Sequence, residues 1–202
     1  MRTKVSELVL CALPLVLSSA IAGTSGLPNR AVSLGPDLSM YVEQGLSVSI
    51  AVKSDGEATM LDGPFSVRFA DGTIAVEGQL KSGQFHGPKV WYDSNGQMRG
   101  RGVYRDGIPV GQEVWWDQFG AVSRILNLDD QGALHGVDSY FSGGTLVRMI
   151  EWNHGEPVVM REYEDGTVVR TSSPEQVWEY FEQRRLKREA QPGATDNPGD
   201  AQ

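Results

Sequence analysis

Glycines divide the middle of this chain into similar segments. The segments open at intervals of about two dozen residues, at Gly63, Gly87, Gly111 and Gly136, and a half-length copy follows from Val158. Inside each segment a glycine turn, such as Asn95-Gly96, separates two runs of β-branched and aromatic residues. That pattern is typical of a β-hairpin. Hairpins in tandem predict a mainly β fold, a single antiparallel β-meander.

Apolar residues fall into columns when they are counted from the turn glycine. The second residue after that glycine is apolar in every segment: Ile74, Met98, Val122, Leu146 and Val168. The eighth is apolar or aromatic in the full-length segments: Leu80, Tyr104, Leu128 and Trp152. Because side chains alternate along a strand, we expect both columns on one buried face. The first strands carry a further column, expected to stack as an aromatic ladder: Phe69, Tyr92, Trp116, Phe141 and Tyr163.

Two segments carry a more specific motif. A Trp-Tyr-Asp or Trp-Trp-Asp run lies between two glycines in Gly87–Gly96 and Gly111–Gly120, and a return turn spans Tyr104–Gly107. Together with the His86-Gly87 and His135-Gly136 joints, this pattern resembles the MORN repeat, and more closely its bacterial variant, a family often catalogued as antitoxins. The resemblance covers about half of the chain. It implies a hairpin-repeat fold, and membrane association or an antitoxin role as functions.

The N-terminal residues are typical of a secretory signal peptide. Arg2 and Lys4 precede an apolar stretch, and small residues lead up to Ala22, after which we predict cleavage. An uncleaved anchor is the alternative, although the stretch is short for a span of about 20 residues. Cys11, the single cysteine, lies inside this segment. The mature protein is therefore expected to be exported, periplasmic or extracellular, and free of disulfides.

We divide the chain into five parts. They are a signal peptide at 1–22, a linker at 23–45, the repeat domain at 46–172, a helix at 173–190 and a disordered tail at 191–202. The repeat domain includes a divergent first hairpin that turns at Ser54-Asp55-Gly56 and caps the sheet. Ser173, Pro174 and Gln176 form a capping-box start for the helix, which we expect to cover the last hairpin.

The formal charge of the chain is −8, and it becomes −9 when Arg2, Lys4 and Glu7 leave with the signal peptide. An acidic surface disfavours nucleic acid as a partner and, less strongly, an anionic membrane. We expect the three histidines, His86, His135 and His154, to lie too far apart to share a metal, with His86 and His135 about 19 Å apart along the sheet. No nucleophile–base pair or phosphate-binding loop is recognisable. We therefore predict no enzymatic activity, no catalytic residue, no metal and no cofactor.

Three arginines interrupt the predicted buried face. Arg124, Arg148 and Arg170 all stand four residues past a turn glycine, where an apolar side chain is expected. A stripe of guanidinium groups can receive a carboxylate or a phosphate from a partner. The alternative is that each arginine pairs with a nearby acid such as Glu113, Glu151 or Glu162. A second candidate binding set, if it faces outward, consists of the aromatic residues Trp91, Trp115 and Tyr140.

These patterns favour an exported, non-catalytic repeat protein that binds or scaffolds another envelope or secreted protein. An open terminal strand offers one way to receive such a partner. Attachment to a membrane or envelope surface is a second interpretation, and an antitoxin or immunity role in the periplasm is a third. The oligomeric state is left open.

Overall fold

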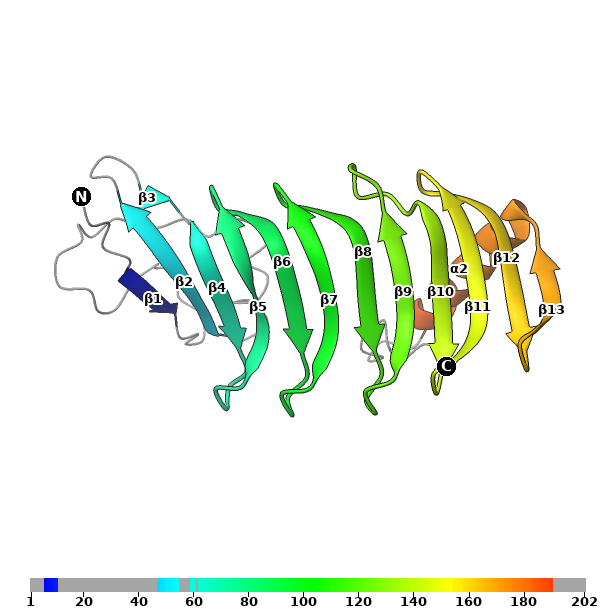
Figure 1. Ribbon diagram of the computed structural model, residues 1–202, viewed down its shortest axis with the longest axis horizontal. Helices are drawn as coiled ribbons and strands as arrows, with labels where there is room; N and C mark the ends of the chain where they lie inside the picture. The colour runs from blue at the N-terminus through cyan, green and yellow to red at the C-terminus, as the bar shows by residue number, and fades with distance from the viewer. Residues whose placement is uncertain (1–5, 11–46, 55–58, 61, 191–202) are drawn as a thin grey trace. The chain divides into compact units, whose positions relative to one another are not determined.

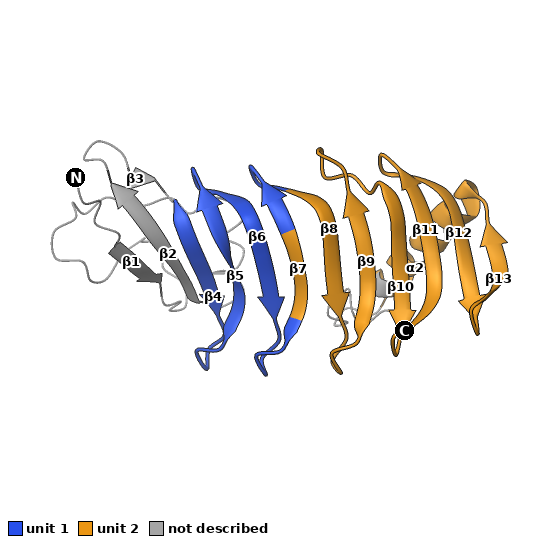
Figure 2. Cartoon of the chain, in the orientation of Figure 1, with its two compact units in different colours: residues 1–98, 103–108 blue, residues 99–102, 109–202 orange. Residues whose placement is uncertain are grey.

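The computed structural model describes residues 6–10, 47–54, 59–60 and 62–190. As predicted, the fold is mainly β: an antiparallel meander of hairpins that does not close into a barrel, followed by one helix (Figure 1). The chain divides into two compact units (Figure 2). Unit 1 comprises residues 1–98 and 103–108, and unit 2 comprises residues 99–102 and 109–202.

Unit 1 contains the first hairpins. Its strands are β1 (Ser6–Leu10), β2 (Ser47–Ser54), β3 (Thr59–Met60), β4 (Gly63–Arg68), β5 (Ile74–Lys81), β6 (Gln84–Tyr92) and half of β7 (Met98–Arg105), whose residues 99–102 belong to unit 2. β1 and β3 pair with β2. Further along the chain β2 pairs with β4, β4 with β5, and β5 with β6, and all of these pairs are antiparallel. The predicted cleavage site at Ala22, the linker, the turn at Asp55-Gly56 and the tail lie outside the described residues, so these assignments stay predictions.

Unit 2 contains the later hairpins and the helix. Its elements are β8 (Ile108–Trp116, from Pro109 onward), β9 (Val122–Leu128), β10 (Gly136–Ser142), β11 (Thr145–Asn153), β12 (Glu156–Glu164), β13 (Thr167–Ser172) and α2 (Pro174–Glu189). Each strand from β8 to β13 pairs antiparallel with the next.

The hairpin turns form where the glycines predict them, and aspartates hold several of them closed. The Asp93 carboxylate accepts backbone N–H groups from Asn95 at 2.9 Å and Gln97 at 3.0 Å. Asp117 does the same for Phe119 and Ala121, both at 2.9 Å. Such side-chain contacts replace the backbone partners that a tight turn leaves unpaired. The opening glycines have positive φ, which only glycine adopts cheaply: Gly63 111°, Gly87 87°, Gly111 72° and Gly136 81°.

A β-bulge near the turn of four hairpins changes which face the apolar columns occupy. In the β8–β9 hairpin Trp115 lies opposite Arg124, but Trp116 lies opposite Val122, so Ser123 is an extra residue. The same shift occurs in the β4–β5, β10–β11 and β12–β13 hairpins. Directly opposed residues share a face and adjacent ones alternate. Val122 therefore lies on the face opposite to Arg124.

The expectation that both apolar columns share one buried face is therefore wrong. The bulge separates the second residue after the turn glycine from the fourth, sixth and eighth, because one inserted residue reverses a period of two. Consistent with this, Met98 is 38% exposed and Val168 is 44% exposed, whereas Leu80 and Trp152 are buried. The aromatic ladder is not seen as a stack. Instead the Tyr92 hydroxyl contacts Glu77, the Trp116 ring lies 5.7 Å from the Arg101 guanidinium, and the Tyr163 hydroxyl contacts Met149.

Helix α2 packs on one face of unit 2. Val177 is fully buried and forms a core with Ile150, Trp152 and Met160. The predicted capping box is present, since the Ser173 N–H donates to Gln176 Oε1 at 2.9 Å. We call the side of unit 2 that α2 covers the helix face, and the opposite side the open face. In Figure 1 the helix lies behind the strands, so the open face is toward the viewer.

Candidate functional site

The three predicted arginines lie on the helix face of unit 2. Arg124 in β9, Arg148 in β11 and Arg170 in β13 lie opposite Trp115, Tyr140 and Glu162 respectively in their hairpins. Each also forms an ion pair with an acidic side chain, which is the alternative that the sequence left open. Of the acids named from the sequence, Glu162 pairs with both Arg148 and Arg170. The partner of Arg124 is Asp138, which sequence reasoning did not single out.

Arg124 forms the most enclosed of these pairs. Its Nε and one terminal nitrogen donate to the two carboxylate oxygens of Asp138 at 2.9 and 2.8 Å, a bidentate geometry. Asp138 is 0% exposed, and the Tyr140 hydroxyl also donates to it at 3.0 Å. Burial, and then the charge of Asp138, raises the pKa of Tyr140 far above its usual value. This group is closed and structural, and it presents no free charge.

Arg148 joins the sheet to the helix. It donates to Glu162 at 3.0 Å and to the Tyr180 hydroxyl of α2, and its guanidinium lies 4.6 Å from the Tyr180 ring. Arg184 donates to the same hydroxyl at 2.8 Å. Three cationic side chains, Arg148, Arg170 and Arg184, therefore gather around the single carboxylate of Glu162 and the hydroxyl of Tyr180.

Arg170 differs from the other two arginines in its exposure. Its side chain is 61% exposed, against 20% for Arg124 and 20% for Arg148. Its contact with Glu162 is long, at 3.6 Å, and Glu162 already accepts a hydrogen bond from Arg148. Of the predicted stripe, Arg170 is thus the member whose charge remains most available to a partner.

The aromatic set that we considered for binding is engaged in contacts with neighbouring side chains and backbone. Trp115 lies against Gly100, where an added Cβ would come within 2.6 Å of the indole ring. Tyr140 lies 4.9 Å from the Arg124 guanidinium, and Trp91 lies opposite the buried Val76 and 6.3 Å from Tyr104. Each of the three is partly buried. Their contacts account for them as packing side chains.

Unit 1 contains a buried lysine that sequence reasoning missed. The Lys89 ammonium lies 3.7 Å from the Phe85 ring centroid, 4.7 Å from Tyr104 and 5.1 Å from Trp91. Lys89 is only 5% exposed, and aromatic faces attract a cation held over them. The signal was present, because Lys89 lies two residues before Trp91 and period-two alternation places both on one face.

The prediction that the histidines lie too far apart is wrong for one pair. The rings of His135 and His154 are 4.5 Å apart, and His154 Nδ1 lies 2.7 Å from Asp129. The two histidines follow different strands, but consecutive turns bring them to the same end of unit 2. In the described residues no group of three or more His, Cys, Asp or Glu has the arrangement of a metal site.

A shared structural role explains why a histidine precedes two of the opening glycines. Backbone N–H groups at three return-turn residues with positive φ donate to the side chain that precedes an opening glycine. The pairs are Ser82 to Asp62, Asp106 to His86 at 3.5 Å, and His154 to His135 at 3.4 Å. His86 and His135 therefore contact the return turn from the position that Asp62 holds, and His86 Nδ1 also lies 3.2 Å from Asp106 Oδ1. The recurrence of histidine reflects the repeat geometry.

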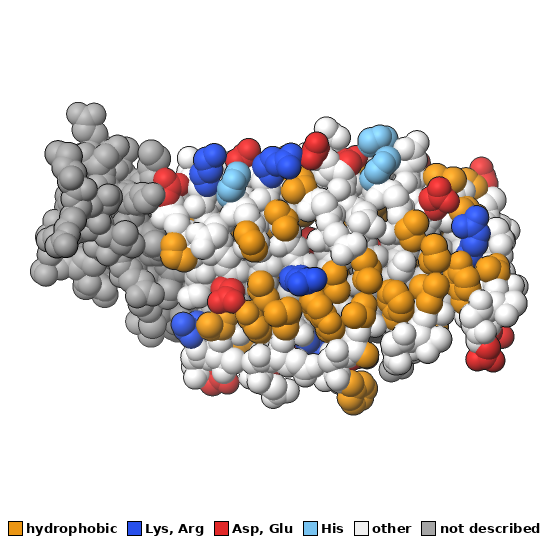
Figure 3. Space-filling view, viewed as in Figure 1, with side chains coloured by type: hydrophobic (Ala, Val, Ile, Leu, Met, Phe, Trp, Pro, Cys, Tyr) orange, Lys and Arg blue, Asp and Glu red, His pale blue; other side chains and the backbone are white. Residues whose placement is uncertain are grey.

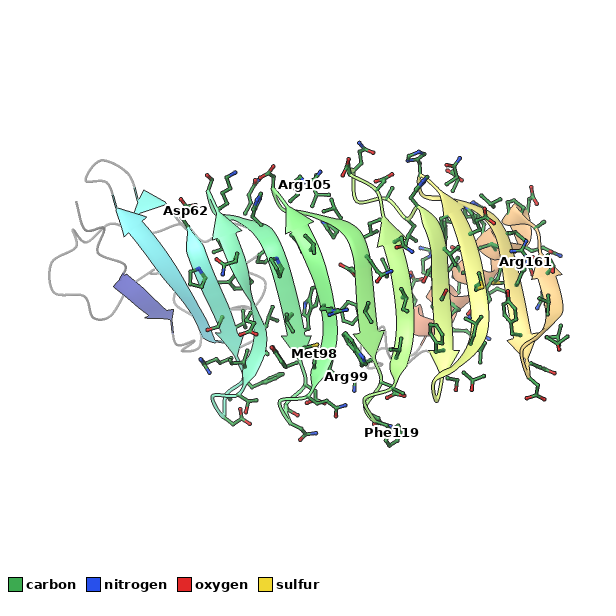
Figure 4. The ribbon with its side chains drawn as sticks, in the orientation of Figure 1. Asp62, Met98, Arg99, Arg105, Phe119 and Arg161 are labelled. Carbon is green, nitrogen blue, oxygen red and sulfur yellow. The ribbon has the colours of Figure 1, made fainter. Side chains whose placement is uncertain are left out.

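The open face of unit 2 carries an apolar strip. Trp116, Phe141 and Tyr163 lie opposite Val122, Leu146 and Val168 on this face. All six are at least partly exposed, and hydrophobic atoms form a band across this part of the surface (Figure 3). Phe119, 83% exposed, projects from the turn between β8 and β9 (Figure 4). None of the strip was proposed as a binding site from the sequence, because the ladder interpretation assigned its aromatic members to packing.

Comparisons with known proteins identify no family. A scan of protein-family models finds no match, and no curated protein matches the chain. Ten chains of solved structures match, among them one in "Crystal structure of GtfA/B complex bound to UDP and GlcNAc", with 14% identity over 62% of this chain. The chain spans 25% of that chain's length, with a TM-score of 0.32, which is too low to support an argument. The MORN resemblance therefore stays a prediction. Among the described helices, none is long and apolar enough to cross a membrane.

Proposed function

We propose that this chain is an exported, non-catalytic binding module that holds another envelope or secreted protein on the open face of unit 2. The observation that carries the proposal is the strip of Trp116, Phe141 and Tyr163 with their apolar neighbours. Aromatic side chains are enriched at protein interfaces and supply most of their binding energy. A hydrogen-bonded sheet holds these rings in fixed positions, which lowers the entropy lost on binding.

The chemistry of the other candidate residues favours binding over catalysis. Arg124 and Arg148 are tied to carboxylates, and His86 and His135 contact return turns. These contacts give each side chain a structural task. Export is proposed on the N-terminal sequence alone.

Capture from envelope extract tests the proposal. Immobilised mature protein is expected to retain one or a few proteins identified by mass spectrometry, and the purified partner is then titrated in solution. Trp116→Ala with Phe141→Ala should weaken that affinity by about a hundredfold, since two central aromatics are removed. The matched control is Trp178→Ala, an aromatic 48% exposed on α2, which should leave the affinity unchanged. Equal affinity of the folded double variant would exclude the open face as the binding surface.

A further inference from the structure

The sheet of unit 2 ends in a strand with one unpaired edge. β13 pairs with β12 on one side, and in the part of the chain that the structure describes no strand pairs with its other side. Figure 1 shows β13 as the last strand, with α2 behind the sheet rather than beyond this edge. Val168, Val169 and Arg170 are 44%, 53% and 61% exposed. An edge of this kind offers unpaired backbone groups to an extended segment.

The preceding hairpins show what normally lies beside such a strand. In β9, Arg124 has Tyr140 of the next strand beside it, and in β11, Arg148 has Glu162 beside it. Arg124 is therefore enclosed between β8 and β10, and Arg148 between β10 and β12. Arg170 holds the equivalent position in β13 but has only Glu162, on one side. The side chain of Arg170 is 61% exposed, against 20% for Arg148, because this neighbouring strand is missing.

We infer that the β13 edge binds an extended segment of the partner protein, antiparallel to β13, with an Asp or Glu side chain beside Arg170. The inference rests on the proposed binding function and adds a second contact to it. The segment takes the place that the first strand of a further hairpin would occupy beside β13. Its acidic residue therefore lies beside Arg170 as Glu162 lies beside Arg148. Backbone hydrogen bonds supply affinity in this mode, and the side chain beside Arg170 supplies specificity.

Charge selects this occupant over a second copy of the chain. In a two-fold pairing of β13 with itself, Arg170 and its symmetry mate would lie within about two residues of each other, and like charges at that spacing repel. β13 contains no acidic residue to compensate. Glu162 is shared between Arg148 and Arg170, so one positive charge at this edge lacks its own carboxylate. An acidic extended segment supplies that charge.

The probe for this edge is a synthetic peptide with the sequence of β12, EPVVMREYE. It carries a Glu at the position that lies beside Arg148 in the fold. Added to the full chain, the peptide should slow amide hydrogen exchange at Thr167–Ser172. Arg170→Glu should weaken its binding about tenfold or more, measured by fluorescence anisotropy, and a peptide with Glu162→Lys should regain affinity for that variant. The matched control is Arg161→Glu. Arg161 belongs to the neighbouring strand β12 and lies opposite Met149 on the open face (Figure 4). The Arg161→Glu variant should bind the peptide as the wild type does.

Three results would overturn the inference: no protection of β13, equal peptide affinity for Arg170→Glu, or self-association through β13 in place of peptide binding. The partner captured from envelope extract separates this inference from the proposed function. If the captured partner depends on Trp116 and Phe141 but binds Arg170→Glu with unchanged affinity, the binding module stands and the edge contact is wrong. If no partner is captured but the peptide protects β13, the edge receives strands and the proposed module is wrong.

Discussion

The buried Lys89 of unit 1 lies against aromatic rings, and the partly buried Arg124 of unit 2 is paired with the fully buried Asp138. In unit 1 aromatic rings cover the Lys89 ammonium, with Phe85 at 3.7 Å. In unit 2 the Arg124 guanidinium donates two hydrogen bonds to the buried carboxylate of Asp138. The side chains match these surroundings, since an ammonium is a compact point charge, whereas a guanidinium is a planar fork that fits a carboxylate. Both contacts form among similar hairpins.

The difference predicts unequal sensitivity to substitution. A ring attracts a nearby cation by about 0.5–2 kcal/mol, and neighbouring rings share the task. Removing one partner from a buried ion pair costs about 3–5 kcal/mol, because the remaining charge stays buried without compensation. Removing the Phe85 ring from Lys89 should therefore cost unit 1 less stability than removing the Asp138 carboxylate from Arg124 costs unit 2.

The largest expected effect is at Asp138. Asp138→Asn keeps the shape but removes the charge beside Arg124, and should lower the free energy of unfolding by about 3–5 kcal/mol in a urea titration. The matched control is Asp71→Asn at an exposed turn, expected to change stability by less than about 0.5 kcal/mol. Replacing both partners, as Arg124→Met with Asp138→Leu, should recover most of the loss. A loss below about 1 kcal/mol for Asp138→Asn would contradict the comparison.

Local chemistry explains what the sequence predicted well. Asn95-Gly96 and Asp165-Gly166 specify turns through their own backbone preferences, and Ser173 with Gln176 specifies the start of α2. These signals need no knowledge of distant residues. The hairpins, their order and the capping helix were therefore predictable.

Non-local geometry explains what was missed. Ser123 bulges because of how the β8–β9 hairpin closes, and this one residue reverses the alternation on which the face assignment depended. The pairing of Arg124 with Asp138 and the contact of His135 with His154 depend on which strands lie side by side. With the bulge known, Asp138 was findable, because it lies two residues before Tyr140 on the arginine face.

The second prediction measures how strongly the rings hold Lys89. In a double-mutant cycle, Phe85→Leu and Lys89→Met should show a coupling free energy of about 1 kcal/mol, because the double variant loses their shared cation–π contact only once. The control cycle pairs Phe85→Leu with Lys81→Met, an exposed lysine of the same unit, and should be additive. Strictly additive effects for Phe85 and Lys89 would show that the rings act on Lys89 by packing alone.

The smallest effect concerns two tyrosines whose pKa values rise for different reasons. In unit 1 a hydrogen bond to Glu77, at 2.6 Å, and then burial raise the pKa of Tyr92 from 10.0 to about 12. In unit 2 burial is the first cause for Tyr140, whose pKa lies higher still. A folded pKa above the unfolded one means that the neutral tyrosine favours folding. The contribution of Tyr92 is therefore complete below its unfolded pKa and is lost as the pH rises from 10.0 to about 12.

Absorbance of tyrosinate, compared between the wild type and Tyr92→Phe, isolates the ionisation of Tyr92. Its midpoint should fall toward the ordinary value in Glu77→Gln, because the acceptor loses its negative charge and with it the stronger hydrogen bond to the neutral hydroxyl. Tyr140 should stay protonated over the same pH range, since removing Glu77 leaves its surroundings in unit 2 intact. A midpoint that does not move in Glu77→Gln would assign the raised pKa of Tyr92 to burial, and the contrast between the two tyrosines would then be one of degree rather than of cause.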